Sequence, residues 1–208
     1  IGIKKFYESM QKDEDNARLA RESVEAEMYY LKYQINPHFL MNTLNNIHAL
    51  IDIDADSAKR GIVELSGMMR HVVYESTAER IPLSKDVEFL QNYIELMRIR
   101  YCQDIEIKFN YPNPMPLTLT VPPLVLIVFV ENAFKHGIAR KKHSYIHIDI
   151  AIEDDSVVAR FENSLSQNSS SKGGGVGLDN VSRRLEHIYG DRYTLDIVRN
   201  SDSYCVTL

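Results

Sequence analysis

The sequence lacks several features that mark particular classes of protein. Its 208 residues include two cysteines and no tryptophan. Cys102 and Cys205 form no spaced metal-ligand pattern and do not suggest a disulfide framework, so we expect a reducing compartment. No apolar run approaches the roughly 18 to 20 residues needed to span a bilayer, and no signal peptide is visible. A basic surface is also not expected, since the net charge is -5, and this argues against binding to nucleic acid.

What the sequence does contain is typical of a soluble globular protein, with 44% hydrophobic and 25% charged residues. Its length suits one large domain or two small ones. The chain begins at Ile1 rather than methionine and stops at Leu208 within a strand-like pattern. We therefore expect a fragment cut from a longer protein, in which any contact with a membrane would run through segments absent from this chain.

An abrupt change of pattern at Pro37 is the most informative feature of the chain. Residues about 4–51 have helical periodicity, with apolar residues every three or four positions. Past Pro37 the same helical face carries His38 and Asn42 in place of apolar side chains. A histidine on a helix is ordinarily a surface or hydrogen-bonded residue. The alternative is a nucleophile, because an imidazole is largely neutral at pH 7 and a ring nitrogen can attack phosphorus. That alternative requires a phosphoryl donor site elsewhere in the chain.

In the first part of the chain, up to about residue 101, the residue pattern predicts helices and no strands. After a polar loop, a second amphipathic helix carries its apolar residues at helical spacing: Ala58, Ile62, Leu65, Met69 and Val72. Two helices joined by a short loop form a hairpin, and since one hairpin buries little core, we expect two copies to form a dimeric four-helix bundle. Residues 81–84 mark a boundary, and a third helical stripe runs from Val87 to Tyr101.

The second part of the chain has a different texture, because helical and strand periods alternate. Strands are predicted at about 105–109, 146–152, 157–161, 192–199 and 203–208, the last two as a hairpin. Helices are predicted at about 122–136 and 177–189, and Gly190 is placed to end the second of them. This order predicts a mixed α/β domain, so we assign the whole chain to the α+β class.

Two segments of this second part carry candidate ligand-binding groups. An apolar helix ends in Glu131–Gly137, which presents Glu, Asn, Lys and His side chains. Carboxylate and amide oxygens suit Mg²⁺ and lysine suits phosphate, although a polar helix end is also common. Residues 173–180 are glycine-rich and open a helix, as in many phosphate sites, but they fit neither a P-loop nor a dinucleotide fingerprint. A flexible linker with a helix cap is the alternative there.

Three segments taken together closely resemble sensor histidine kinases of the LytS/YehU type. They are 36–42 (NPHFLMN), 131–137 (ENAFKHG, with Pro-Pro-Leu at 122–124) and 175–185 (GVGLDNVSRRL), in this order. The resemblance covers about residues 25–208. We do not expect all three segments to occur together in this order by chance.

The resemblance implies one domain for each part of the chain. Residues 1–80 would hold a signalling helix and the hairpin for dimerisation and histidine phosphorylation. Residues 81–103 would form a linker helix. Residues 104–208 would form an ATP-binding catalytic domain of the GHKL (Bergerat) type, an α/β sandwich with a mobile lid at about 164–174. Such a fragment would work at the cytoplasmic face of the bacterial inner membrane.

The resemblance also implies which residues react and which bind ATP. His38 would be phosphorylated by Mg-ATP and would pass the phosphoryl group to an aspartate of a response regulator, the expected partner besides a second copy of the chain. Asn42 would position the phosphoryl group or a water molecule, and Asn132 would hold Mg²⁺ through the phosphates. The remaining nucleotide-binding positions would be Lys135, His136, Asn163, Gly175, Gly177 and Leu178.

Two positions depart from the pattern of related kinases. Asn163 stands where an aspartate usually reads the adenine amino group, after a strand expected to end near residue 161, and the following glycine is missing. An amide oxygen still accepts a hydrogen bond, but it lacks the charge of a carboxylate. Phe39 stands where many histidine kinases place an acidic general base, so the base is unassigned. The alternative function is therefore a signalling scaffold or phosphatase-dominant receptor fragment that binds nucleotide weakly.

Overall fold

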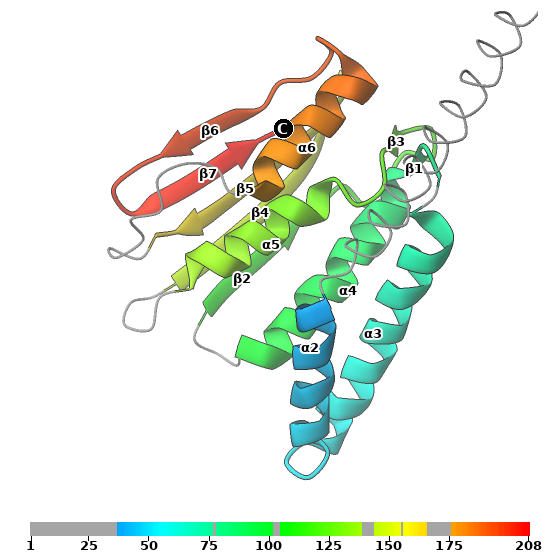
Figure 1. Cartoon of the computed structure of the whole chain (residues 1–208), viewed down its shortest axis with the longest axis vertical. Coiled ribbons are helices and arrows are strands. Elements are labelled where there is room, and N and C mark those ends of the chain that lie inside the picture. The colour runs from blue at the N-terminus through cyan, green and yellow to red at the C-terminus, as the bar shows by residue number, and fades with distance from the viewer. Residues whose placement is uncertain (1–36, 77, 102–104, 139–143, 155, 166–175) are drawn as a thin grey trace, which may run out of the picture. The chain divides into compact units, whose positions relative to one another are not determined.

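The structure is a computed structural model that describes residues 37–76, 78–101, 105–138, 144–154, 156–165 and 176–208 (Figure 1). The chain divides into two compact units, Ile1–Asn45 and Asn46–Leu208. Helix α2 (Pro37–Leu50) crosses that division and confirms the end of the first predicted helix. The part of that prediction before Pro37 lies outside the described residues. Among the described helices, none is both long and apolar enough to cross a membrane.

Helix α3 (Ala55–Glu75) begins at a side-chain cap and packs through one face. The carboxylate of Asp54 accepts a hydrogen bond from the backbone N–H of Ser57 at 3.0 Å, which satisfies a donor of the first turn. A Cβ added at Gly61 would lie 2.9 Å from Ile47 Cγ1, so this glycine lets the last turn of α2 approach α3 closely. The buried positions of the face are Ala58, Gly61, Leu65, Met68, His71 and Val72.

Helix α4 (Leu83–Tyr101) confirms the predicted third helix and lies against α3. It follows β1 (Ile81–Pro82), which pairs antiparallel with β3 (Thr120–Val121) and so fixes the start of α4 to the segment before α5. The aromatic ring of Tyr93 meets that of Phe134 edge-on at 5.9 Å, which joins α4 to α5.

A five-stranded sheet forms the other layer of the second unit. In spatial order its strands are β2 (Ile105–Asn110), β4 (Ser144–Glu153), β5 (Ser156–Ser164), β7 (Ser203–Thr207) and β6 (Asp196–Arg199). The β2 and β4 strands pair in parallel, and the other neighbours pair antiparallel. The sheet is therefore mixed, which confirms the α+β assignment.

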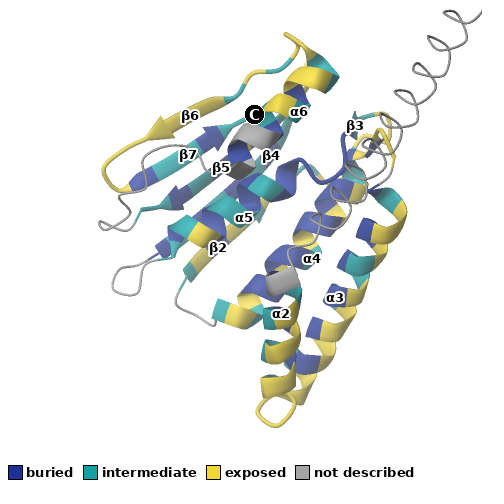
Figure 2. Ribbon diagram, in the orientation of Figure 1, coloured by how far each residue is buried: buried dark blue, intermediate teal, exposed yellow. Residues whose placement is uncertain are grey.

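Helices α5 (Leu126–Gly137) and α6 (Val176–Tyr189) lie on one face of this sheet (Figure 1). The rings of Phe129 and Phe161 stack at 5.2 Å between α5 and β5. Alternate residues of β4 are buried beneath α5, and Figure 2 shows that buried residues concentrate in α4, α5 and the central strands, whereas β6 is exposed. The core of the unit therefore lies between the sheet and its helices.

Three predicted boundaries are wrong. Helix α5 begins at Leu126 instead of near 122, because Leu124 has a left-handed backbone with φ of 60°. Strand β5 continues to Ser164 instead of ending near 161, so Asn163 is inside the strand. The terminal hairpin uses only Asp196–Arg199 and Ser203–Thr207, since a turn follows α6 directly and the Tyr193 hydroxyl donates a hydrogen bond back to Ser182 of that helix. Helix α6 agrees with its prediction, and Gly190 follows it with φ of 57°.

Candidate functional site

The last turns of α5 carry three of the predicted binding residues. Asn132, Lys135 and His136 stand three and four positions apart, so they share one side of the helix. Asn132 and His136 are half-buried and Lys135 is exposed. The first half of α5 is almost wholly apolar and lies in the core, so that this polar end is held rigidly at the edge of the layer.

Asn163 joins this helix end to the sheet. It is only 1% exposed, on the same face of β5 as Phe161, and a Cβ added at Gly137 would lie 2.8 Å from Asn163 Cβ. The hydroxyl of Ser164 donates a hydrogen bond to the carbonyl of Gly137 at 2.8 Å, and the Asn163 amide donates one to the Ser164 carbonyl at 2.8 Å. Two segments that are far apart in the sequence and were both predicted to bind nucleotide therefore meet directly.

Burial shifts the pKa of two ionisable groups at this end of α5, His136 and Glu131. Burial lowers the pKa of His136, and the positive charges of Lys135 and Arg199 lower it further. The imidazole is therefore neutral at pH 7, where one ring nitrogen can donate and the other accept. Burial raises the pKa of Glu131, while the charge of Lys135 acts in the opposite direction.

Asn132 is suited to a ligand that accepts a hydrogen bond, such as a phosphate oxygen, whereas a metal ion would be held by its amide oxygen. Its side-chain Nδ2 is buried and has no hydrogen-bond partner among the described residues, which a native interior tolerates poorly. The described residues contain no cluster of three or more His, Cys, Asp or Glu that could hold a metal ion. A divalent ion at this site would therefore depend on a single protein amide together with ligand phosphates, as Mg²⁺ commonly does.

The other predicted site residues are spread over both units. Leu178 is buried at 7% exposure near the start of α6, which contacts α5, and Gly177 is in the first turn of the same helix. Gly175 and most of the predicted lid lie outside the described residues. His38 and Asn42 lie one turn apart on α2, and the side chain of His38 is not among those described.

The sequence reasoning missed the part played by Ser164. Its hydroxyl also accepts a hydrogen bond from the Tyr145 backbone N–H at 3.2 Å, so one serine links β4, β5 and α5 beside Asn163. Its position next to Asn163 gave no signal, because Ser164 was taken as the first residue of a loop. Gly137 was quoted as part of a motif, but its close approach to Asn163 becomes visible only in the fold.

Comparisons with known proteins agree on one class. Residues 26–105 match the family described as Histidine kinase. The sensor protein LytS of Oceanobacillus iheyensis is 32% identical over 86% of this chain and 33% of its own length. LytS of Staphylococcus epidermidis is 28% identical over 83% of this chain and 32% of its own length. Among solved structures, the histidine kinase domain of the Erythrobacter litoralis EL346 blue-light activated histidine kinase covers 86% of this chain and 90% of its own, at 14% identity and a TM-score of 0.46.

The sequence matches place the chain among the sensor histidine kinases. Within that class it is a relative of the LytS sensor proteins, and it spans about a third of the length of the curated relatives it matches. The structural likeness is too loose to add to this conclusion.

Proposed function

We propose that this chain is the kinase portion of a two-component sensor, which uses ATP to phosphorylate His38 and passes the phosphoryl group to an aspartate of a response regulator. The observation that carries this proposal is the junction of α5 and β5. It gathers an unsatisfied amide at Asn132, the cation of Lys135 and the buried amide of Asn163 around one end of the layer. These are the groups that a nucleotide with its phosphates and base requires.

Each residue of the junction has a proposed part in binding Mg-ATP. Asn132 would hold Mg²⁺, whose charge offsets that of the phosphate oxygens when it is bound. Lys135 would hold a phosphate as a mobile point charge. Neutral His136 would donate a hydrogen bond, and the amide oxygen of Asn163 would accept one from the adenine amino group. Gly175, Gly177 and Leu178 would border the phosphates at the start of α6, beside a lid at about 164–174.

The chemistry proposed for His38 is nucleophilic. The lone pair of a neutral ring nitrogen attacks the γ-phosphorus, a nitrogen–phosphorus bond forms, and the bond to the bridging oxygen breaks with its electron pair leaving on ADP. An aspartate carboxylate of the response regulator then attacks the same phosphorus and the nitrogen–phosphorus bond breaks. Asn42, one turn further along α2, would orient the phosphoryl group or a hydrolytic water.

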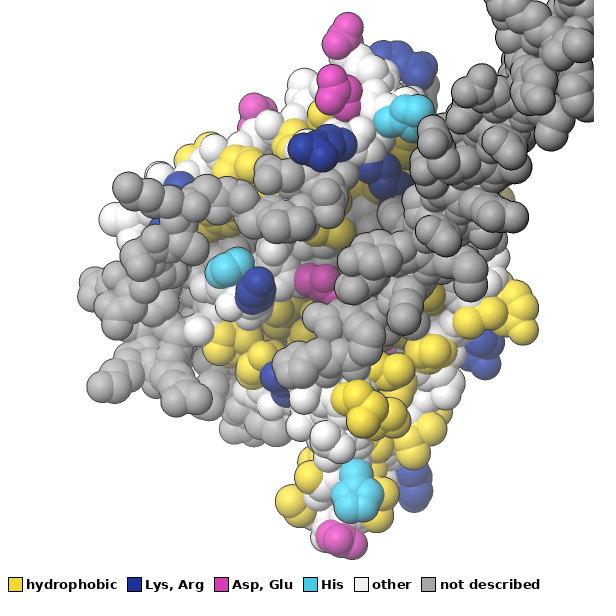
Figure 3. All heavy atoms as spheres, viewed as in Figure 1, with side chains coloured by type: hydrophobic (Ala, Val, Ile, Leu, Met, Phe, Trp, Pro, Cys, Tyr) yellow, Lys and Arg dark blue, Asp and Glu magenta, His cyan; other side chains and the backbone are white. Residues whose placement is uncertain are grey.

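We further propose that the hairpin within residues 1–80 pairs with that of a second copy in a four-helix bundle, with residues 81–103 as linker helix and 104–208 as catalytic domain. On α3 several large apolar side chains remain at the surface, and Figure 3 shows hydrophobic side chains gathered there. Ile62 and Val73 are 51% and 61% exposed, and with Met69 they stand seven and four positions apart along one side of the helix. An exposed apolar stripe at this spacing favours a partner helix.

One observation favours the second candidate function, a weakly nucleotide-binding scaffold or a phosphatase-dominant receptor fragment. Asn163 replaces a carboxylate with a neutral amide at the base-reading position. A neutral acceptor forms a weaker hydrogen bond than a charged one, so nucleotide affinity would fall.

The deciding experiment is incubation with radiolabelled Mg-ATP, comparing the chain with His38→Ala. A label that is stable in alkali, labile in acid and absent from the variant supports phosphorylation of histidine. An equal label in both proteins would disprove the assignment of His38. Calorimetric titration with Mg-ATP distinguishes the scaffold, because the kinase must bind nucleotide at millimolar concentration and a degraded site does not.

A further inference from the structure

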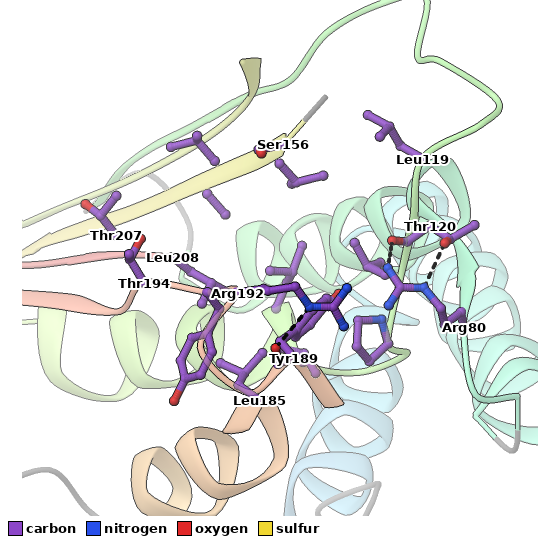
Figure 4. A pocket seen from close by; sticks show the side chains of 18 of the residues that line it. Arg80, Leu119, Thr120, Ser156, Leu185, Tyr189, Arg192, Thr194, Thr207 and Leu208 are labelled. Atoms are coloured by element: carbon purple, nitrogen blue, oxygen red, sulfur yellow. Dashed lines mark hydrogen bonds between the residues drawn. The ribbon is translucent and has the colours of Figure 1, made fainter. Parts of the chain in front are cut away.

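A cavity lies at the opposite end of α5 from the candidate nucleotide site. It has a volume of about 650 Å³, opens to solvent and is lined by the segment containing β3, the start of β5, the end of β7, the end of α6 and the turn after it (Figure 4). Val125 and Leu126 contribute the beginning of α5, whereas Lys135 and His136 lie in its last turn. At a rise of about 1.5 Å per residue the two ends are roughly 15 Å apart. The cavity is therefore separate from the site described above.

Much of the lining of this cavity is apolar, and its polar members include Thr118, Thr120, Ser156, Thr194 and Thr207. Val125, Leu126, Ala159 and Leu185 line the cavity, and none of them is more than 3% exposed. These residues come from α5, β5 and α6, so this part of the lining belongs to the core of the unit. Leu119, Val157 and Val158 also line the cavity and are half-buried, so they offer apolar surface to a ligand. A cavity of this volume and lining suits the apolar body of a small organic molecule.

Two arginines stand at its mouth. Arg80 is held in place, since its Nε donates to Thr120 Oγ1 at 2.9 Å, its Nη2 donates to the Thr120 carbonyl at 2.6 Å, and its guanidinium carbon lies 5.2 Å from the centre of the Tyr189 ring. Arg192 donates from Nε to the Tyr189 carbonyl at 3.3 Å. Figure 4 shows the two guanidinium groups pointing toward each other. Arg80 Nη1 and the two terminal nitrogens of Arg192 form no hydrogen bond with any residue that the structure describes.

The charges at the mouth are not balanced. Neither Arg80 nor Arg192 forms an ion pair with any residue that the structure describes. Asp191 also lines the cavity, which leaves an excess of one positive charge over these three side chains. Two facing guanidinium groups repel each other, and an anion between them would convert that repulsion into two charge-assisted interactions. The planar forks of arginine match carboxylate, sulfonate and phosphate groups.

We propose that this cavity binds an amphipathic organic anion, with its acidic group between Arg80 and Arg192 and its apolar body against Leu119, Val157 and Val158. The site is independent of the proposed kinase reaction. It requires both features, the apolar part of the lining and the paired cations, so a neutral apolar molecule or a bare inorganic anion binds less well.

The test uses 8-anilinonaphthalene-1-sulfonate as probe and its uncharged counterpart N-phenyl-1-naphthylamine as control, both followed by fluorescence with the 208-residue chain. We expect saturable binding of the sulfonate at one site, with a dissociation constant of about 10–100 µM for a ligand of this size. Arg80→Gln and Arg192→Gln each weaken it about tenfold but leave the uncharged probe unaffected. Arg60→Gln, a change to an exposed arginine of α3, is the matched control and changes neither. Octanoate and octyl phosphate compete with the sulfonate, and their ranking separates carboxylate from phosphate ligands.

Two further results decide the location. Thr194→Trp, at an exposed residue lining the cavity, abolishes binding of both probes while thermal unfolding by circular dichroism stays cooperative. Displacement of the sulfonate by ADP would place the probe in the nucleotide site and overturn the proposal. Absence of saturable binding, or equal binding by the chain and Arg192→Gln, would overturn it as well. Arg192 keeps this test valid even if Arg80→Gln disturbs the contact with Thr120.

Discussion

Asn163 illustrates how one amide can serve both structure and binding. It is buried against Gly137, and its Nδ2 donates to the Ser164 carbonyl, which leaves the amide oxygen as the acceptor for a ligand. We predict that Asn163→Asp destabilises the ligand-free chain by about 1–3 kcal/mol, because a carboxylate is buried and the donated hydrogen bond is lost. Affinity for ATP rises at the same time, since a charged acceptor binds the adenine amino group more strongly. Urea denaturation and calorimetry measure the two effects, and a loss of both stability and affinity would show that Asn163 is only structural.

Asp86 is a second residue whose environment governs its chemistry. It is fully buried on α4, its Oδ1 accepts a hydrogen bond from the Leu124 backbone N–H at 3.3 Å, and its Oδ2 has no partner among the described residues. Burial raises its pKa to about 7, although the Leu124 hydrogen bond and the charge of Arg184 act in the opposite direction. The folded chain therefore favours the protonated carboxyl.

The pH dependence follows from that raised pKa. The contribution of Asp86 to stability is fully present below the unfolded pKa near 3.8 and is lost as pH rises to about 7, a change of at most about 4 kcal/mol. Asp86→Asn keeps an acceptor for Leu124 and cannot ionise. We predict that the variant is more stable than the parent chain at pH 8 and similar to it at pH 4, by urea denaturation at both values. Asp56→Asn, on the exposed start of α3, is the control, and an equal gain there would contradict the assignment to Asp86.

At the scale of elements, the contact of α5 with β5 positions the candidate site. Gly137→Ala introduces a methyl group 2.8 Å from Asn163 Cβ, so the helix end must move away from the strand. We predict a loss of about 1–3 kcal/mol in the free energy of unfolding, as for other overpacked sites, together with weaker ATP binding. Both are measured with the same urea and calorimetric titrations.

Gly190→Ala is the matched control for that prediction. Gly190 has φ of 57° and no atom lies near its added Cβ, so the cost is backbone strain of about 1–2 kcal/mol and no steric clash. It should leave ATP affinity unchanged. If the two variants weaken ATP binding equally, the effect of Gly137→Ala reflects general destabilisation instead of the α5–β5 contact.

The elements themselves were mostly predictable from periodicity, and their ends were not. The alternating isoleucines of β4 and the stripe from Val87 to Tyr101 identified a strand and a helix correctly, because both patterns follow from burial on one face. The start of α5 was wrong since Pro122–Leu124 is as apolar as the helix that follows. That turn differs from the helix in the pairing of β3 with β1, in the left-handed backbone of Leu124 and in the hydrogen bond that the Leu124 N–H donates to Asp86.

The buried face of α3 shows the same limit. The predicted stripe included Ile62 and Met69, but Ile62 is exposed, and Gly61 and Met68 are buried in their place. A glycine carries no apolar signal, yet here it admits Ile47 of α2. The motif residues of the candidate site were predicted because polar groups interrupt an apolar helix. Their junction through Ser164 depends on contacts between distant segments, which no local pattern encodes.

At the scale of the whole molecule, α4 is more than a connector. It lies against α3, and through Tyr93 and Tyr101 it contacts Phe134 of α5, at ring distances of 5.9 and 6.3 Å. The helix that carries Asn132 is therefore in continuous contact, through α4, with the helix whose exposed apolar stripe we propose as a dimer interface. A change at that interface has a packed route to the candidate site.

The exposed stripe of α3 gives a prediction for the assembly. We predict that the parent chain is a dimer and that Ile62→Glu combined with Val73→Glu makes it a monomer, because two carboxylates would have to be desolvated in an apolar interface. Sedimentation equilibrium measures the mass. Val198→Glu is the control, since Val198 on β6 is 54% exposed, close to the 61% of Val73, and lies on no proposed interface. If the double variant remains a dimer, the stripe is not the dimer interface. If the parent chain is already a monomer, the stripe does not mediate self-association. Because either substitution adds charge only at the surface, the fold of each monomer should remain intact, and calorimetric ATP binding tests that directly.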